Sequence, residues 1–267
     1  MKSVNTEKTT NDDFYVVAHE PGAQHPNLPT WASNTKNPFE LASAKNDVIR
    51  QDIPQVPGAF QLLNVLTSQE CDRLIAATES LGYLPDAAVS LPRNVRHNDN
   101  LTMVVDELTD ETIWQRVASL FMPNDENFQG LNPLGINARF RFYRYQEGDF
   151  FKKHIDGSWP GSRVINEELI TQAYDDRWSQ MTFLILLSDD FDGGATRFWV
   201  NKNDPTLPAR QEKDANVVDV RTPKGGVLVF PHGHHPMHCL HGSQTITAGT
   251  KYIIRTDVLF EIGAIQC

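Results

Sequence analysis

"INARFRFYRYQ", residues 136–146, is the stretch that decides the fold, because its alternation of aromatic, apolar and charged residues predicts a β-strand. Further strand-like runs follow it: "QMTFLILLS" (180–188), "ATRFWV" (195–200), "GGVLVFP" (225–231) and "KYIIRTDVLF" (251–260). Gly, Asp, Asn and Pro separate these runs, and helices do not alternate with them. The sequence therefore predicts an α+β, mainly β protein with a β-sandwich or jelly-roll core.

Two helices are predicted upstream of these strands. "TSQECDRLIAATESLGY" (67–83) opens with Thr67 and Glu70 in capping-box spacing, and Gly82 ends it. "TDETIWQRVASLFM" (109–122) carries apolar residues at helical spacing. Residues 1–57 are rich in Asn, Thr, Pro and Lys, so we expect a flexible tail and arm there, with the folded domain spanning residues 58–267.

The composition excludes several classes of function. The chain has 267 residues, 40% of them hydrophobic, and a formal net charge of −10, which argues against nucleic acid as a partner. It has no apolar run of membrane-spanning length and begins without a secretory signal. The three cysteines are odd in number and widely spaced, so no disulfide framework is expected. We expect a cytoplasmic protein, with a homodimer as one option for its assembly.

"KKHIDGSW", residues 152–159, places a histidine and an aspartate two positions apart. On a strand, His154 and Asp156 would face the same side, where an imidazole and a carboxylate can bind one metal ion. Alternatively, they are a surface histidine and a turn-forming aspartate before Gly157.

A second histidine-bearing segment, "PHGHHPMHCLHG" (231–242), contains His232, His234, His235, His238 and His241. Such tracts bind metals promiscuously, so a zinc-dependent hydrolase built on residues 232–241 is one reading, although the segment offers no carboxylate. In another reading, His154, Asp156 and His241 form a two-histidine, one-carboxylate triad of the kind that non-haem Fe(II) oxygenases use. Lys251, ten residues after His241, could then anchor a dicarboxylate co-substrate.

Several ordered motifs support the second reading. "RYQEGDFFKKHID", "MTFLILLSDDFDGGATRF", "PKGGVLVF" and "LHGSQTITAGTKY" match, in order and spacing, the conserved segments of a known family. Over roughly residues 58–262 the chain resembles the 2-oxoglutarate and Fe(II)-dependent dioxygenases of the prolyl 4-hydroxylase-like group. The resemblance implies a double-stranded β-helix, a cupin-like jelly-roll with flanking N-terminal helices.

The resemblance also implies a set of site residues. His154, Asp156 and His241 match the catalytic iron ligands, and Lys251 matches the residue that binds the C5 carboxylate of 2-oxoglutarate. Cofactor binding is further implied for Tyr145 and Thr182, and less directly for Arg255. The implied cofactors and co-substrates are Fe(II), 2-oxoglutarate and O2.

The implied reaction is hydroxylation, or another oxidation, of an unactivated C–H bond in a small-molecule or amino-acid-like substrate, with conversion of 2-oxoglutarate to succinate. A peptide substrate, and thus a peptidyl-prolyl hydroxylase, is an alternative, as is a non-catalytic jelly-roll binding protein. Arg141, Tyr143, Arg96 and Trp159 are candidate substrate contacts. Buried arginines are costly without partners, so Arg141 is expected to meet a carboxylate of the protein or of a substrate.

Overall fold

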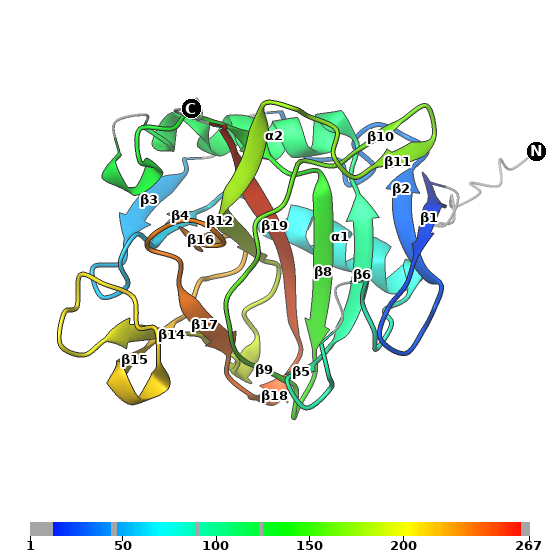
Figure 1. Cartoon of the computed structure of the whole chain (residues 1–267). Helices are drawn as coiled ribbons and strands as arrows, with labels where there is room; N and C mark the ends of the chain where they lie inside the picture. Colours follow the sequence, from blue (N-terminus) through cyan, green and yellow to red (C-terminus); the bar gives the residue numbers. More distant parts are fainter. Residues whose placement is uncertain (1–12, 44–46, 89–90, 123–124, 263–267) are drawn as a thin grey trace, which may run out of the picture.

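The computed structural model describes residues 13–43, 47–88, 91–122 and 125–262. Two sheets of unequal size dominate it (Figure 1). The large sheet has the order β1-β2-β6-β8-β19-β12-β16-β4-β3, with β7 also paired to β19, and the small sheet has the order β15-β14-β17-β9-β5. Two two-stranded sheets complete the strands: the hairpin of β10 with β11, and the pair of β13 with β18, which are distant in the sequence.

The strands of the large sheet are β1 (Phe14–Glu20), β2 (Leu28–Ser33), β3 (Ile49–Asp52), β4 (Phe60–Leu63), β6 (Asp99–Val104), β7 (Pro133–Ile136), β8 (Arg139–Tyr145), β12 (Arg177–Leu186), β16 (Val227–Pro231) and β19 (Lys251–Glu261). Those of the small sheet are β5 (Arg96–His97), β9 (Phe150–His154), β14 (Thr196–Asn201), β15 (Ala215–Val220) and β17 (Leu240–Ser243). The strands of the two-stranded sheets are β10 (Arg163–Ile165), β11 (Glu168–Ile170), β13 (Phe191–Gly193) and β18 (Ile246–Gly249).

The two faces of the large sheet bury different sets of side chains. On one face, Phe140, Phe142 and Ile254 pack with the helices in the larger of two hydrophobic clusters. On the other face, Tyr143, Tyr145 and residues of β12, β16 and β19 pack with residues of the small sheet. The alternation read from residues 139–145 is therefore confirmed. Two facing sheets with helices against one of them are the predicted jelly-roll, a double-stranded β-helix.

Two α-helices cover the outer face of the large sheet. In α1 (Ser68–Leu81) the predicted capping box is present, because Thr67 accepts from the Glu70 N–H and Glu70 accepts from the Thr67 N–H. α2 spans Glu107–Val117 and starts before the predicted residue 109, since the Asp106 carboxylate accepts from two N–H groups of its first turn. Short 3-10 turns follow at Ala118–Leu120, Glu126–Phe128 and Glu212–Asp214.

The expectation of an irregular arm over residues 1–57 was wrong for the part that the structure describes. β1, β2 and β3 lie within this range, and β2 pairs in parallel with β6 through Thr30 and Trp31. The side chains of β2 alternate between buried and half-buried, which is the period of a strand. The polar composition of this region masked the short strand pattern. In addition, the partner strand lies about 70 residues further along the chain, so no local pattern indicates the pairing. Residues 1–12 lie outside the described residues.

Candidate metal centre

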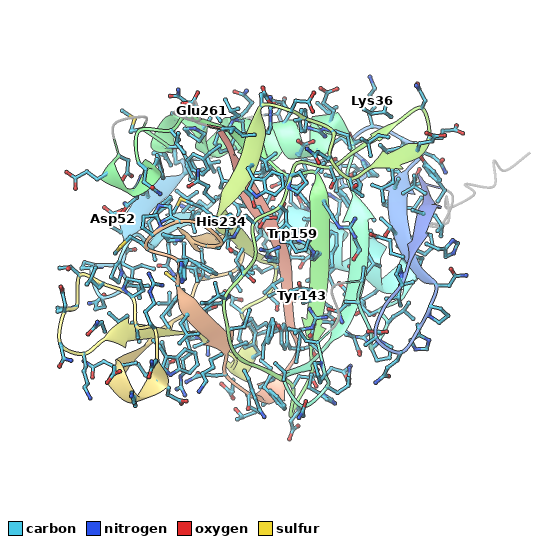
Figure 2. All side chains as sticks on the ribbon, viewed as in Figure 1. Lys36, Asp52, Tyr143, Trp159, His234 and Glu261 are labelled. Carbon is cyan, nitrogen blue, oxygen red and sulfur yellow. The ribbon has the colours of Figure 1, made fainter. Side chains whose placement is uncertain are left out.

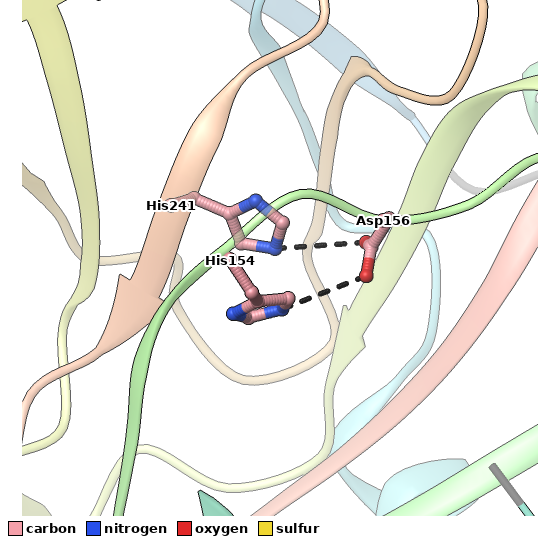
Figure 3. A group of neighbouring side chains, drawn as sticks. All are labelled: His154, Asp156 and His241. Atoms are coloured by element: carbon pink, nitrogen blue, oxygen red, sulfur yellow. Dashed lines mark ion pairs between the residues drawn. The ribbon is translucent and has the colours of Figure 1, made fainter. Parts of the chain in front are cut away.

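His154, Asp156 and His241 converge between the two sheets, as Figure 3 shows. His154 ends β9 and pairs in register with His241 of β17. The Nε2 atom of His154 lies 3.6 Å from Asp156 Oδ1, and that of His241 lies 3.5 Å from Asp156 Oδ2. Asp156 belongs to the loop after β9, so the bend of this loop, rather than strand alternation, brings the carboxylate to the histidines.

Backbone carbonyls fix how the two imidazoles point. His154 Nδ1 lies 2.9 Å from the carbonyl oxygen of Lys152, and His241 Nδ1 lies 3.1 Å from that of Cys239. A carbonyl only accepts, so Nδ1 carries the proton in both rings and Nε2 directs a free lone pair towards Asp156. This is the outer hydrogen bond that metal-ligating histidines usually make.

The charge states at the site also suit metal binding. Burial, reinforced by the neighbouring His154, lowers the pKa of His241 to about 3, so its imidazole is neutral. Burial by itself would raise the pKa of Asp156, but the Arg255 guanidinium outweighs it and holds that pKa well below its ordinary value. The site thus presents a neutral imidazole and a carboxylate at neutral pH, the forms in which these groups bind metals.

A chain of hydrogen bonds connects the Asp156 carboxylate to the backbone N–H of Trp159. Thr182 Oγ1 lies 2.7 Å from Asp156 Oδ2 and 2.9 Å from His232 Nδ1. The carboxylate can only accept, so the hydroxyl donates to Asp156 and accepts from His232. His232 Nε2 then accepts from Ser179 Oγ at 3.0 Å, and Ser179 accepts from the Trp159 N–H at 2.7 Å.

His232 lies directly after β16 and is fully buried. The sequence could have predicted this burial, because His232 continues the two-residue spacing of Leu228 and Phe230, which face the space between the sheets. The other histidines of this segment do not form a site: His234 is exposed, while His235 and His238 hydrogen-bond to backbone carbonyls. Across the described ranges, the one cluster suited to a metal is His154, Asp156 and His241.

Lys251 lies in the same cavity as the three converging side chains. Its side chain is buried, and Nζ donates to the Gly194 carbonyl at 2.6 Å and to Ser243 Oγ at 3.1 Å. Its ammonium lies 5.4 Å from the ring centre of Tyr145. Burial, together with Arg221, lowers the pKa of Lys251 to about 7. A carboxylate entering the cavity would restore the ammonium form.

The walls of the cavity come from both sheets. Apart from the residues already named, they comprise Tyr143, Phe151, Leu184, Thr196, Phe230, Gly242, Ile253 and Arg255. Phe151 stacks on His154 with 3.5 Å between ring centres, a contact that the sequence did not predict. Tyr143 and Tyr145, two positions apart on β8, both line the cavity.

The remaining candidate residues lie around the cavity. Arg255 Nε is 3.5 Å from Asp156 Oδ2, and Arg255 Nη2 is 2.9 Å from Asp257 Oδ1. Arg96 lies over the rings of Tyr143 and Phe151. Arg141 and Trp159 do not belong to the cavity wall but contact each other, with 5.1 Å between guanidinium and ring centre.

Comparison with known protein families agrees with the geometry of this metal centre. Residues 140–256 match the family model described as the 2OG-Fe(II) oxygenase superfamily. This segment contains all three converging side chains and Lys251. No curated protein matches the sequence. In the described residues, no helix is both long and apolar enough to cross a membrane.

Solved structures with a similar chain path include several prolyl hydroxylases. The collagen prolyl hydroxylase of Paramecium bursaria Chlorella virus-1, in complex with 2-oxoglutarate, is 14% identical, covers 79% of this chain and 100% of its own, and gives a TM-score of 0.48. The Trichoplax adhaerens prolyl hydroxylase bound to a hypoxia inducible factor peptide is 17% identical, with coverages of 77% and 83% and a TM-score of 0.49. A Pseudomonas putida prolyl-4-hydroxylase is 18% identical, with coverages of 76% and 92% and a TM-score of 0.46.

Proposed function

We propose that this chain, which belongs to the 2OG-Fe(II) oxygenase superfamily, hydroxylates an unactivated C–H bond of a small-molecule or amino-acid-like substrate. The reaction would convert 2-oxoglutarate to succinate. One observation carries the proposal: His154, Asp156 and His241 line the same cavity as Lys251, so a metal site and a cation for a dicarboxylate face the same space.

The residues present fit both cofactors. Two imidazole nitrogens and one carboxylate oxygen are the donor set of a facial triad, which leaves positions on Fe(II) open for 2-oxoglutarate and O2. The ammonium of Lys251 would hold the far carboxylate of 2-oxoglutarate, beside the ring of Tyr145. When bound, Fe(II) and 2-oxoglutarate together supply the oxidising power for the reaction.

The chain's own contribution is to orient these groups and to keep water out. The carbonyl contacts at Nδ1 hold each imidazole with Nε2 towards the metal position. We assign Thr182 to holding Asp156 rather than 2-oxoglutarate, because its single hydroxyl proton is directed at Asp156 Oδ2. Apolar side chains such as Leu184, Phe230 and Ile253 line the rest of the cavity and exclude water.

The cavity is narrow and is lined by residues of both sheets, which favours a small substrate over a peptide. Prolyl peptides remain the alternative to test, because the compared structures are named as prolyl hydroxylases.

The first experiment is an anaerobic titration. Metal-free protein would be mixed with Fe(II) and 2-oxoglutarate, and the visible charge-transfer band of the ternary complex recorded. We expect the band in the wild type, its loss in His241→Ala, and a higher 2-oxoglutarate requirement in Lys251→Met. His238→Ala is the matched control: its imidazole belongs to the same segment but hydrogen-bonds to the His235 carbonyl instead of joining the three converging side chains, so this variant should leave the band intact.

Absence of the band in the wild type, combined with tight Zn(II) binding that survives His241→Ala, would refute the proposal in favour of a zinc site. With the band established, succinate release in the presence of free amino acids or of prolyl peptides would separate the two substrate classes.

A further inference from the structure

Two arginines face each other directly across adjacent strands of the large sheet. Arg141 of β8 and Arg255 of β19 are register partners, and both side chains are buried on the inner face, with 7% and 6% exposure. Like charges directly opposite each other on two strands are destabilising, and more so out of contact with water. A buried arginine pair therefore needs counter-charges.

The described residues supply one carboxylate of their own to this pair. Asp257, fully buried two positions after Arg255, lies 2.9 Å from Arg255 Nη2 but 3.9 Å from Arg141 Nη1. Asp156 also lies near Arg255, but it belongs to the proposed metal site. The next arginine on β8 differs, since Arg139 has its own partner in Glu20 at 2.5 Å.

The positive charge of Arg141 is consequently not neutralised by a carboxylate at hydrogen-bond distance, although packing holds the side chain in position. Within the part of the chain that the structure describes, its buried Nη1 has no hydrogen-bond partner. Its guanidinium lies over the ring of Trp159, three residues after Asp156, and the backbone N–H of Trp159 donates to Ser179 Oγ. Trp159 is labelled near the middle of Figure 2. Burial, and then repulsion from Arg255, lowers the pKa of Arg141 to about 10.

The charges of the cofactors do not correct this imbalance, an argument that rests on the proposed function. Fe(II), the Asp156 carboxylate, doubly negative 2-oxoglutarate and protonated Lys251 balance one another. Arg141 and Arg255 then face Asp257 alone, which leaves one buried positive charge beside the metal centre. Buried charge is tolerated when it is paired, so a single anionic group is missing.

We propose that the substrate carries a carboxylate, which Arg141 and Arg255 bind beside the metal centre. Guanidinium groups suit this role because their fixed N–H donors match the two oxygens of a carboxylate. The ring of Trp159 flanks Arg141 and offers an apolar surface for the part of the substrate next to the carboxylate.

The test uses matched probes that differ only in charge: benzoate with benzamide, and N-acetyl-L-leucine with N-acetyl-L-leucinamide. The thermal unfolding midpoint (Tm) of protein loaded with redox-inactive Mn(II) and saturating 2-oxoglutarate would be measured at constant ionic strength. Each probe would be added at increasing concentrations up to its solubility limit. We expect the carboxylates to raise the Tm of the wild type and the amides to leave it unchanged. Arg141→Met should weaken carboxylate binding about tenfold or more, the cost of losing charged hydrogen bonds.

A second readout separates a binding role from a structural one. Without a probe, Arg141→Met should have a Tm equal to or above that of the wild type, because it removes a repelled charge while a thioether still packs against Trp159. Arg139→Met is the matched control on the same strand and face: it breaks the pair with Glu20, so its Tm should fall while the response to carboxylates persists.

Three results would overturn the inference. A lower Tm in Arg141→Met with an unchanged carboxylate response would make Arg141 a structural partner of Asp257. A loss of 2-oxoglutarate affinity in Arg141→Met would show that the co-substrate supplies the carboxylate. Absence of any carboxylate response in a wild type that binds 2-oxoglutarate would also refute it, whereas a wild type that fails to bind 2-oxoglutarate would refute the proposed function itself.

Discussion

Binding of 2-oxoglutarate should depend on pH through Lys251. The pKa of this buried amine is about 7 instead of 10.5, because burial and Arg221 disfavour the ammonium form. In the free protein, Lys251 is therefore about half protonated near pH 7. A carboxylate placed against it favours the ammonium, so above pH 7 binding must be accompanied by uptake of a proton.

The size of the effect follows from that pKa. At pH 6 about nine-tenths of the molecules carry the ammonium form that binds, and at pH 8 only about a tenth do, so Kd for 2-oxoglutarate should rise about tenfold from pH 6 to pH 8. The carboxylates of 2-oxoglutarate titrate far below this range and do not contribute. The same shift acts on stability: between about pH 7 and 10.5 the unfolded chain binds more protons at Lys251, so ligand-free protein should gain stability with rising pH.

Calorimetric titration of Mn(II)-loaded protein with 2-oxoglutarate measures both quantities. Repeating it in buffers of different ionisation enthalpy gives the number of protons taken up, which should be close to one at pH 8 and close to zero at pH 6. Lys251→Arg is the matched control, because a guanidinium stays charged over this range and should abolish the proton uptake and flatten the pH dependence. A wild-type Kd that does not change from pH 6 to pH 8, or a slope that persists in Lys251→Arg, would refute this account of Lys251.

Three further predictions test the support of the site and of the fold. Thr182→Val should weaken Fe(II) affinity about 10- to 100-fold in a metal titration, since Asp156 loses the donor that holds it, while 2-oxoglutarate affinity at saturating metal stays within twofold. Glu70→Gln should lower the free energy of unfolding by about 3–5 kcal/mol in a denaturant titration, because it leaves Arg116 buried without its carboxylate. Phe140→Ala on the helix-facing side of the large sheet should cost about 3–5 kcal/mol, and folded molecules should keep normal metal affinity.

Much of the fold followed from local patterns. The capping box of α1 and the alternation along β8 are written in consecutive residues, and both are confirmed. β2 was missed because its identity depends on a parallel partner far away in the sequence, β6. Local polarity suggested an irregular segment there, and long-range pairing decided otherwise.

The site, like the fold, was only partly predictable from the sequence. The three converging side chains were found because motif spacing reflects a recurring geometry, although strand alternation was the wrong reason for Asp156. The hydrogen bonds of Thr182 and His232 could not be predicted, since their atoms meet only when β12 and β16 pair in register. Sequence patterns show which residues are chemically able to act, while contacts across strands determine what each one holds.

The distribution of charge along β19 links the proposed co-substrate and substrate sites. Lys251, Arg255 and Asp257 occupy positions of the same face of β19 and face the small sheet, which carries His154 and His241. Four residues of strand separate Lys251 from Arg255 by about 13 Å, so two carboxylates can be bound along one strand without competing for one cation. Exchanging the charged residues at these two positions should therefore not preserve function, even though the net charge is unchanged. Arg255 has Asp156 and Asp257 beside it, whereas Lys251 contacts a carbonyl and a hydroxyl, and each position is adapted to a different anion.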